Sequence, residues 1–300
     1  MAGTVLVTGA SGALGRPLLR ELAGRGWRRR ALVHRRAVDE ADEHVAGDLR
    51  DIGSLRAAAT GVDAVVHLAG LTHARDPRAY REVNVAGTEA LLDACRREGV
   101  GRFVLVSTRA VSPEGGAYSR SKLGAEEAVR ASGLPFVVVR LPEIYGAGGA
   151  GGVDGIVARV GKGRAVPVVG AGSDEVCPVL LDDVLPAVAL CLDPSAAPAG
   201  RTYTLAGPCL STRAFAEACA RAHGARSRVV GLPVAIVRAL SQLARVVPLP
   251  LYPDQLDRLR AGKPPASPEA ASELGFRPRA VENGLAALIA QRAPLACPPS

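Results

Sequence analysis

Residues 4–15 read TVLVTGASGALG, an apolar and β-branched run that leads directly into Gly9, Gly12 and Gly15. The apolar run has the composition of a buried strand, and a helical pattern follows the last glycine. A strand, a glycine turn and a helix N-terminus in this order present backbone N–H groups and the positive end of a helix dipole, which favours a pyrophosphate. The candidate dinucleotide-binding residues of this loop are Gly9, Ser11, Gly12, Ala13, Leu14 and Gly15.

The first half of the chain repeats this alternation of short apolar runs and longer amphipathic stretches. The remaining predicted strands are Arg30–His34, His44–Ala46, Ala64–Leu68, Arg102–Ser107 and Phe136–Leu141, and the predicted helices are Gly12–Gly24, Ser54–Ala59, Arg78–Glu98 and Tyr118–Ser132. Repeated βαβ units indicate a parallel sheet with helices on both faces. The sequence therefore predicts an α/β fold with a doubly wound parallel sheet.

The residue composition and the pattern of apolar residues change after Tyr145. A glycine-rich loop, GAGGAGGVDG, precedes a predicted helix near Val153–Gly161, and helical patterns with proline-rich connections dominate from about Leu205. These features predict a smaller, mostly helical C-terminal lobe that binds the substrate. The predicted dinucleotide-binding domain covers residues 1–148 with 176–205 returning to it, and the lobe covers 149–175 and 206–300.

Charge and cysteine content exclude several classes of protein. The net charge is +8, but the basic residues are spread along the chain and aromatic residues make up only 3%, so we expect an anionic small-molecule ligand and no nucleic acid. The six cysteines contain no C-x-x-C pair, and no histidine lies at zinc-ligand spacing from them. We expect reduced, mostly buried thiols and no metal site.

The longest apolar stretch, Val229–Leu251, is interrupted by prolines and arginines and is predicted not to span a membrane. Its polar residues Arg238, Ser241, Gln242 and Arg245 fall on one stripe of a helix, which favours an amphipathic helix packed on the protein, with a membrane-surface helix as the alternative. The chain begins without the features of a secretory signal, so we expect a cytoplasmic protein.

Tyr118 and Lys122 are four residues apart on a predicted helix and therefore lie on one face of it. A free phenol has a pKa of about 10. A neighbouring ammonium group stabilises the phenolate, so such a pair can serve as a general acid or base. A surface pair without function is the alternative. We predict that Tyr118 and Lys122 are catalytic residues that also contact the cofactor.

Further segments make a family resemblance specific. Gly47-Asp48-Leu49 follows the third predicted strand and His67-Leu68-Ala69-Gly70 follows the fourth. With the glycine turn and the Tyr-Lys pair, they make the sequence similar, over nearly its whole length, to the extended short-chain dehydrogenase/reductase superfamily of the NAD-dependent epimerase/dehydratase type. The resemblance implies a Rossmann-type fold, adenine contacts from Asp48 and Leu49, and further cofactor contacts from Leu68, Ala69 and Gly70; for Asp48, a helix cap before Asp51 is the alternative.

The resemblance also assigns a substrate side to the site. Family members carry Ser or Thr at the position of Thr108, whose hydroxyl would hold the reacting oxygen, with Ser107 as a second candidate; a strand-end Thr bonded to its own backbone is the alternative. Residues 140–146, RLPEIYG, are similar to the family's R-x-P-x-x-Y-G stretch. Pro142 would then line the nicotinamide, and Glu143 and Tyr145 the substrate cleft.

Two features bear on the reaction and the cofactor. Sugar 4,6-dehydratases of this family place an Asp-Glu pair after the Thr, but Arg109 and Ala110 stand there, which disfavours a dehydratase. At the end of the second strand, Arg35 and Arg36 follow His34 and no acid appears before Asp39. Arginine suits a ribose 2′-phosphate, so NADP is favoured over NAD, although arginine can also stack on an adenine.

The resulting functional hypothesis is an NAD(P)-dependent oxidoreductase or epimerase acting on a nucleotide-sugar, either a C4 epimerase working through a 4-keto intermediate or a 4-ketoreductase. The alternative is a non-catalytic NAD(P)-binding regulatory or assembly protein of the same fold. Arginines of the C-terminal lobe, such as Arg258, are candidates for binding a nucleotide pyrophosphate. The resemblance also implies a homodimer that pairs through the helices Arg78–Glu98 and Tyr118–Ser132.

Overall fold

The computed structural model describes residues 3–149, 151–226, 228–244, 247 and 252–292. The chain divides into two compact units. We call residues 1–141, 185–205 and 238–276 the sheet unit, and residues 142–184, 206–237 and 277–300 the small unit. Each is described by itself.

The sheet unit is built on seven parallel strands in the order β11-β6-β5-β4-β1-β2-β3. Their bounds are β1 (Thr4–Thr8), β2 (Arg28–Val33), β3 (Glu43–Ala46), β4 (Ala64–His67), β5 (Arg102–Thr108), β6 (Phe136–Leu141) and β11 (Arg201–Thr204). The order reverses on either side of β1, as in a doubly wound sheet, so the predicted fold class is confirmed. The four-residue edge strand β11 was not predicted as a strand.

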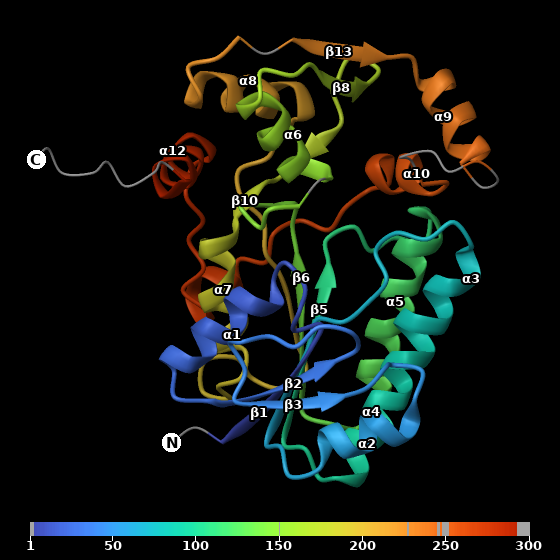
Figure 1. The fold of residues 1–300 in the computed structure, drawn as a ribbon, viewed down its shortest axis with the longest axis vertical. Helices are drawn as coiled ribbons and strands as arrows, with labels where there is room; N and C mark the ends of the chain where they lie inside the picture. The colour runs from blue at the N-terminus through green and yellow to red at the C-terminus, as the bar shows by residue number, and fades with distance from the viewer. Residues whose placement is uncertain (1–2, 150, 227, 245–246, 248–251, 293–300) are drawn as a thin grey trace, which may run out of the picture. The chain divides into compact units, whose positions relative to one another are not determined.

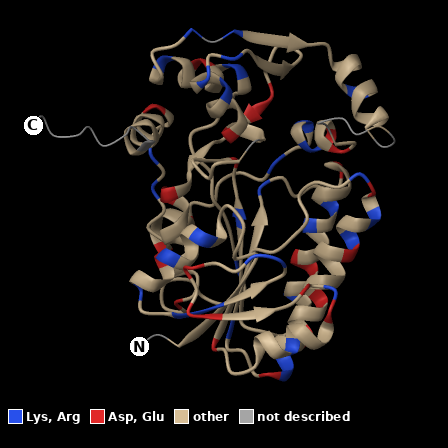
Figure 2. Ribbon diagram, viewed as in Figure 1, with Lys and Arg blue, Asp and Glu red and all other residues tan. Residues whose placement is uncertain are grey.

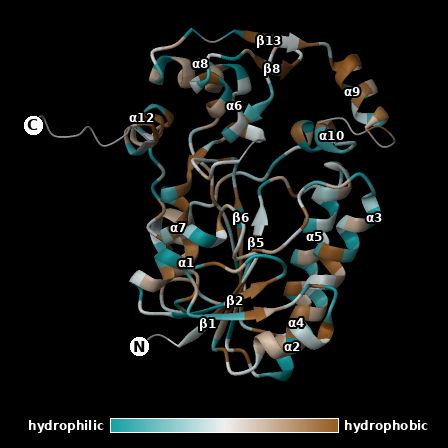
Figure 3. Ribbon diagram, in the orientation of Figure 1, coloured by the Kyte–Doolittle hydropathy of each residue, from teal (hydrophilic) through white to brown (hydrophobic). Residues whose placement is uncertain are grey.

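Helices cover both faces of this sheet. Figure 1 shows α2 (Ile52–Ala59), α4 (Gly87–Arg97) and α5 (Gly116–Ala131) along one face and α1 (Gly15–Gly24) on the other. The central strands β4 and β5 are buried along nearly their whole length, which explains their continuous apolar sequence. Figure 3 shows this apolar core as brown strands between helices with teal outer residues.

The predicted helix Arg78–Glu98 is divided into three segments. They are α3 (Pro77–Tyr80), a π-helical segment η1 (Arg81–Ala86) and α4. Such wide turns frequently occur at functional sites. Here the π-helical segment contains Asn84, which is buried and turned toward α5.

The described part of the small unit contains three helices and three two-stranded sheets. The helices are α6 (Gly152–Gly161), α8 (Thr212–Ala222) and α12 (Val281–Arg292). The sheets pair β7 (Ile144–Tyr145) with β10 (Val179–Leu180), β9 (Glu175–Val176) with β12 (Leu210–Ser211), and β8 (Val166–Val169) with β13 (Val229–Leu232). Strands this short carry too few residues to show an alternating pattern, so the periodicity of the sequence did not predict them.

The segment 238–276 lies with the sheet unit, whereas the sequence assigned it to the substrate lobe. It contains α10 (Gln255–Arg260) and α11 (Glu269–Glu273). Ser267 exchanges hydrogen bonds with the backbone of Thr204 in β11, which ties the segment to the sheet edge. α7 (Leu181–Leu190) and α9 (Val234–Leu243) each begin in the small unit and end in the sheet unit.

The polar stripe predicted for the segment around α9 does not face the solvent as a whole. Ser241 is buried and donates to the Arg238 carbonyl, whereas Ile236, Leu240 and Leu243 are exposed. A serine that bonds its own helix backbone can be buried without a further partner, which explains the difference. Arg245 lies outside the described residues. Among the described helices, none combines the length and the apolar character that crossing a membrane requires.

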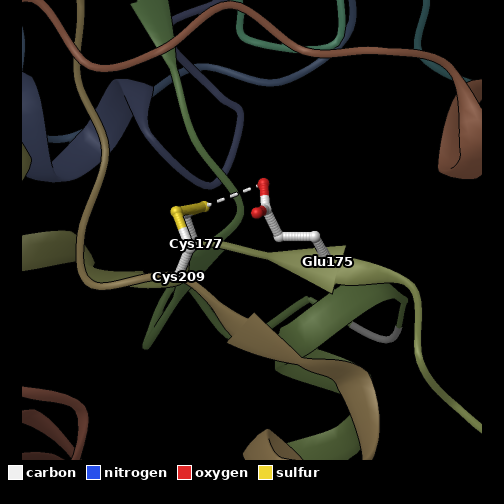
Figure 4. Close-up of side chains that lie close together, drawn as sticks. All are labelled: Glu175, Cys177 and Cys209. Atoms are coloured by element: carbon white, nitrogen blue, oxygen red, sulfur yellow. Dashed lines mark hydrogen bonds between the residues drawn. A yellow bond between two sulfur atoms is a disulfide. The ribbon is translucent and has the colours of Figure 1, made fainter.

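The expectation of reduced cysteines is wrong at one pair. Cys177 and Cys209 form a disulfide in the small unit, while Cys95, Cys191 and Cys219 are free and buried. The antiparallel pairing of β9 with β12 sets Val176 opposite Leu210, which brings the neighbouring cysteines together. Figure 4 shows Glu175 beside this pair, with its carboxylate 3.6 Å from the Cys177 sulfur. Because both sulfurs are bonded to each other, neither is a thiolate ligand for the metal ion that these three side chains could otherwise hold.

Candidate active site

The glycine turn after β1 fits a dinucleotide pyrophosphate. Gly9 has a φ of +71°, and a Cβ there would lie 2.7 Å from the Ala69 backbone nitrogen. A Cβ on Gly15 would collide with the Ala10 and Gly9 carbonyls. Helix α1 starts at Gly15 with no side-chain cap and no acidic residue in its first turn, so its positive end is left for an anion. Ser11, Gly12 and Ala13 are exposed at this turn, and Leu14 is half-buried.

The predicted adenine end of the site has a clear charge pattern. Arg35 and Arg36, just after β2, are exposed and form no ion pair with any described residue. Asp48 is bonded instead to Arg50 at 2.8 Å and lies 3.3 Å from His34, and the Arg50 hydrogen bonds hold the pKa of Asp48 well below its usual range. Leu49 is buried against Gly87.

A buried histidine links the glycine turn to the loop after β4. His67 Nδ1 lies 2.6 Å from the Thr8 hydroxyl, and its Nε2 lies 3.0 Å from the Thr88 hydroxyl. Thr88 donates to the Asn84 carbonyl, so it accepts from Nε2–H and leaves Nδ1 to accept from Thr8. Burial, with a contribution from Lys122, lowers the pKa of His67 to about 3, so the ring is neutral. The Thr8 oxygen also accepts from the Ala69 N–H, which fixes the loop of Leu68, Ala69 and Gly70 beside the glycine turn.

Tyr118 and Lys122 are both buried on α5, on the side of the helix that faces β5. Lys122 Nζ donates to the Val106 carbonyl at 3.0 Å and comes within 4.0 Å of the position that a Cβ on Gly70 would take. The ammonium group therefore lies next to the loop that contacts the glycine turn. Tyr118 is 8% exposed, and its phenol interacts with the Thr108 side chain at the end of β5.

The charges around this pair shift both pKa values. Burial raises the pKa of Tyr118, while Arg258 and the Thr108 hydrogen bond lower it and Asp254 raises it; the net pKa is raised. Burial lowers the pKa of Lys122 to about 8, against an opposing contribution from Glu126. A phenol and an ammonium group that are both withdrawn from water are typical of an acid–base site.

Comparisons with known proteins show the family of this chain. The sequence profile of the NAD-dependent epimerase/dehydratase family matches residues 5–206. This chain belongs to that family.

Relatives of this family member include reductases. The chain is 37% identical over 198 residues to a ceramide reductase of Caulobacter vibrioides, and the match spans 64% of this chain but only 62% of that protein. It is 33% identical over 231 residues to a 2-alkyl-3-oxoalkanoate reductase of Stenotrophomonas maltophilia, covering 66% of this chain and 69% of that one. A solved structure of a DesIV double mutant, a dTDP-glucose 4,6-dehydratase of Streptomyces venezuelae with NAD and DAU bound, is 25% identical, covers 97% of each chain and gives a TM-score of 0.76.

The two residues after Thr108 are not the Asp-Glu pair that sequence analysis associated with sugar 4,6-dehydratases. The Arg109 guanidinium is buried and donates to the Pro264 carbonyl at 3.0 Å, and Ala110 has no titratable group. The Thr108 hydroxyl accepts the Ala110 N–H at 3.1 Å in addition to meeting Tyr118. Sequence analysis offered two roles for Thr108, a contact with the reacting groups and a hydrogen bond to its own backbone. The structure shows the Thr108 hydroxyl bonded to nearby backbone and also beside the Tyr118 phenol.

Ser107 does not face the phenol. Its hydroxyl donates at 2.7 Å to Glu126, which is fully buried. Glu126 also accepts from Arg140 in β6 and from Arg130 on α5. Burial alone would raise the pKa of Glu126, but these hydrogen bonds outweigh it and the net pKa is lowered. These hydrogen bonds therefore hold the Glu126 carboxylate in place, one helical turn after Lys122 on α5.

Asn84 in η1 joins the loop after β4 to α5. Its side chain exchanges two hydrogen bonds with the Leu71 backbone, at 2.7 and 2.9 Å, and donates to the Ser121 hydroxyl at 2.9 Å. Ser121 in turn donates to the Tyr118 carbonyl. Sequence reasoning missed Asn84, because an asparagine within a helical pattern gives no signal of a tertiary contact. Glu126 did have a signal, since it continues the stripe of Tyr118 and Lys122 at the same four-residue spacing.

The remaining predicted residues belong to the small unit. Glu143 accepts the Cys177 N–H at 3.2 Å, and its own carbonyl accepts the Val179 N–H. Tyr145 is 1% exposed, and its ring centroid lies 5.8 Å from that of Phe215 in the core of the small unit. Pro142, directly after β6, is half-buried. The substrate and cofactor contacts expected of these three residues stay predictions.

Proposed function

We propose that this protein transfers a hydride between a nicotinamide cofactor and a secondary alcohol or ketone, with Tyr118 as the proton donor and acceptor. The observation that carries this proposal is the buried Tyr118 phenol held against Thr108, on a helix whose next turn places the Lys122 ammonium group beside Gly70. A bound nicotinamide would supply or accept the hydride. The glycine turn, Ala69, Gly70 and Lys122 are the residues that would hold it.

In the reducing direction, the Thr108 hydroxyl donates a hydrogen bond to the substrate carbonyl oxygen while the carbonyl carbon receives the hydride. The oxygen then takes the proton of Tyr118, so a ketone becomes a secondary alcohol and Tyr118 becomes a phenolate. Lys122 stabilises that phenolate, and proton uptake from solvent restores the phenol. In the oxidising direction, the phenolate accepts the alcohol proton and the same residues act in reverse order.

Two substrate classes are candidates. A nucleotide-sugar fits the net charge of +8 and is the kind of compound, dTDP-glucose, for which the DesIV dehydratase is named; it would make this chain a C4 epimerase or a 4-ketoreductase. An apolar ketone is favoured by the two reductases at 33% and 37% identity, whose names specify a ceramide and an alkyl-oxoalkanoate. Because both of those relatives are reductases, we favour reduction over epimerisation. Arg109 and Ala110, in place of an acidic pair, argue against a dehydratase step.

The finer features of the proposal concern cofactor and assembly. Arg35 and Arg36 are exposed and have no ion-pair partner among the described residues, which supports NADP as the preferred cofactor, because a 2′-phosphate would find two cations and no carboxylate directly after β2. We also propose a homodimer that forms through the outer surfaces of α4 and α5. The family resemblance supports this pairing.

The test is a Tyr118→Phe variant assayed with NADPH and NADH against sugar-nucleotide ketones and long-chain 3-keto compounds. Removing the hydroxyl should lower kcat at least 100-fold, because general acid–base catalysis contributes about two to four orders of magnitude. Cofactor affinity should change little, since the ring remains. Turnover that survives in Tyr118→Phe would contradict the mechanism. Unaltered cofactor binding with no turnover of either class by the unmodified protein would favour the non-catalytic alternative.

A further inference from the structure

Residues far along the chain pack against α5, the helix that carries Tyr118. We call residues 252–261 the docking segment; it consists of Tyr252 to Asp254, helix α10 and Ala261. Asp254 is 8% exposed, and its carboxylate accepts the Tyr118 backbone N–H at 3.1 Å and the Tyr80 hydroxyl at 3.4 Å. It thus satisfies a free donor in the first turn of α5.

A glycine just before Tyr118 makes this contact possible. Gly116 has a φ of +84°, and a Cβ there would lie 2.8 Å from the Asp254 Cβ. A Cβ on the neighbouring Gly115 would instead clash with Ser119 of α5, whose Oγ would be 2.5 Å away. The local sequence before the catalytic tyrosine is therefore adapted to receive this segment.

Arg258 lies one helical turn after Asp254 and reaches the tyrosine itself. Its guanidinium carbon is 4.7 Å from the centroid of the Tyr118 ring, and its Nη1 donates to the Thr72 carbonyl at 3.3 Å. The Tyr80 ring also packs edge-on against Tyr118, with the two ring centroids 5.8 Å apart. The Tyr80 hydroxyl accepts the Ala74 N–H. The phenol ring therefore contacts both a second aromatic ring and a cation.

We propose that Arg258 is a positioning residue of the active site, whose guanidinium stacks on Tyr118 and stabilises the phenolate formed when that residue gives up its proton. The inference rests on the proposed function of Tyr118. A cation over an aromatic face is attracted to the ring's electron density, and that density increases when the phenol ionises. Arg258 therefore acts on the same ionisation that we propose for Lys122.

The groups that face Tyr118 have opposing effects on its ionisation. Arg258 and Asp254 come from the docking segment, Tyr80 from α3 and Thr108 from β5, and Lys122 follows Tyr118 by one turn on α5. His73, in the loop before α3, lies near Arg258 and against the Tyr252 ring. The positive Arg258 lowers the pKa of Tyr118 and the negative Asp254 raises it. Removal of each charge should move the titration of Tyr118 in the opposite direction.

The experiment titrates the phenol directly and needs no substrate. The near-ultraviolet absorbance of tyrosinate is recorded against pH for the full-length protein and for R258M, R258K and D254N, and the signal of the matching Tyr118→Phe protein is subtracted from each. R258M should lower the ionisation constant of Tyr118 on the order of tenfold, R258K should lower it less, and D254N should raise it. Arg260→Met, which removes an exposed arginine two residues away, should leave it unchanged.

Each result is decisive. A midpoint that does not move in R258M and R258K, or that moves the same way in D254N, overturns the proposal and assigns Arg258 a purely structural role. If R258M does not fold, as judged by circular dichroism, the opposite shifts of R258K and D254N carry the test. Loss of turnover in Tyr118→Phe is measured separately, so failure of the proposed function and failure of this inference give different results.

Discussion

The side-chain ammonium group of Lys122 is largely removed from solvent. It is 7% exposed, and burial lowers its pKa to about 8, well below the ordinary value for lysine. Below pH 8 the folded protein therefore holds a charge that the unfolded chain would hydrate better. Between pH 8 and the ordinary lysine pKa, the unfolded chain binds a proton that the folded protein has released, so this group makes stability rise with pH.

We expect Lys122→Met to raise the free energy of unfolding at pH 7 by on the order of 2 kcal/mol, because it removes the cost of the buried charge. The gain should shrink as the pH rises above 8. Urea unfolding at pH 7 and pH 10 measures both values. Lys162→Met is the control, since Lys162 is exposed on the small unit and should give no change. A Lys122→Met protein less stable than the parent at pH 7 would show that the ammonium group stabilises the fold.

The sequence predicted the residues whose roles depend on local spacing. The glycines after β1 and the pair Tyr118 and Lys122 lie where their spacing placed them, because the turn and the helix are local structures. Asn84, Asp254 and the stacking of Arg258 were not predicted, since they depend on contacts between residues far apart in the chain, 136 positions in the case of Asp254 and Tyr118. No periodic pattern carries information about such contacts.

Among helices and strands, too, the sequence predicted those that depend on local pattern and missed those that depend on contacts far apart in the chain. Strands β1 and β6 have the predicted bounds because each apolar run ends at residues that interrupt a strand, glycine for β1 and proline for β6. The paired strands of the small unit are only two to four residues long, and their pairing depends on segments elsewhere in the chain. The π-helical segment η1 was predicted as continuous α-helix, because a wide turn leaves no mark in the pattern of apolar residues.

The disulfide between Cys177 and Cys209 is an element that stability measurements can detect. It joins residues 32 positions apart, and closing a loop of that length in the unfolded chain should stabilise the protein by about 3 to 4 kcal/mol. We therefore expect Cys209→Ser to lower the free energy of unfolding by roughly that amount. A thiol reductant should destabilise the parent protein to the same level and leave Cys209→Ser unchanged. Equal stability of the parent with and without reductant would show that the pair is not bonded in solution.

At the scale of the whole molecule, charge is distributed rather than concentrated. Figure 2 shows basic and acidic residues interspersed on the helices of both units, and several are paired, such as Arg28 and Arg30 with Glu43. Arg35 and Arg36 differ, because they form no ion pair within the part of the chain that the structure describes and their charge is left for a ligand.

Cofactor preference should appear in the stability of the whole protein. A ligand that binds only the folded state at about 100 times its Kd stabilises it by about 3 kcal/mol. We expect NADP to raise the melting temperature more than NAD at equal concentration, and the double substitution R35A and R36A to remove the difference. Arg25→Ala, at the end of α1 and paired with Glu21, is the matched control. Equal or greater stabilisation by NAD would contradict the NADP preference.

The bond between Asp254 and the Tyr118 backbone has a consequence for the chain during its synthesis. The seven strands of the large sheet end at residue 204, so a nascent polypeptide can complete that framework while residue 254 is still inside the ribosome. At that stage the first turn of α5 lacks its carboxylate partner and the tyrosine ring lacks its covering arginine. Translation of the residues that follow the sheet would thus finish the proposed acid–base centre last, after the proposed platform for the nucleotide already exists.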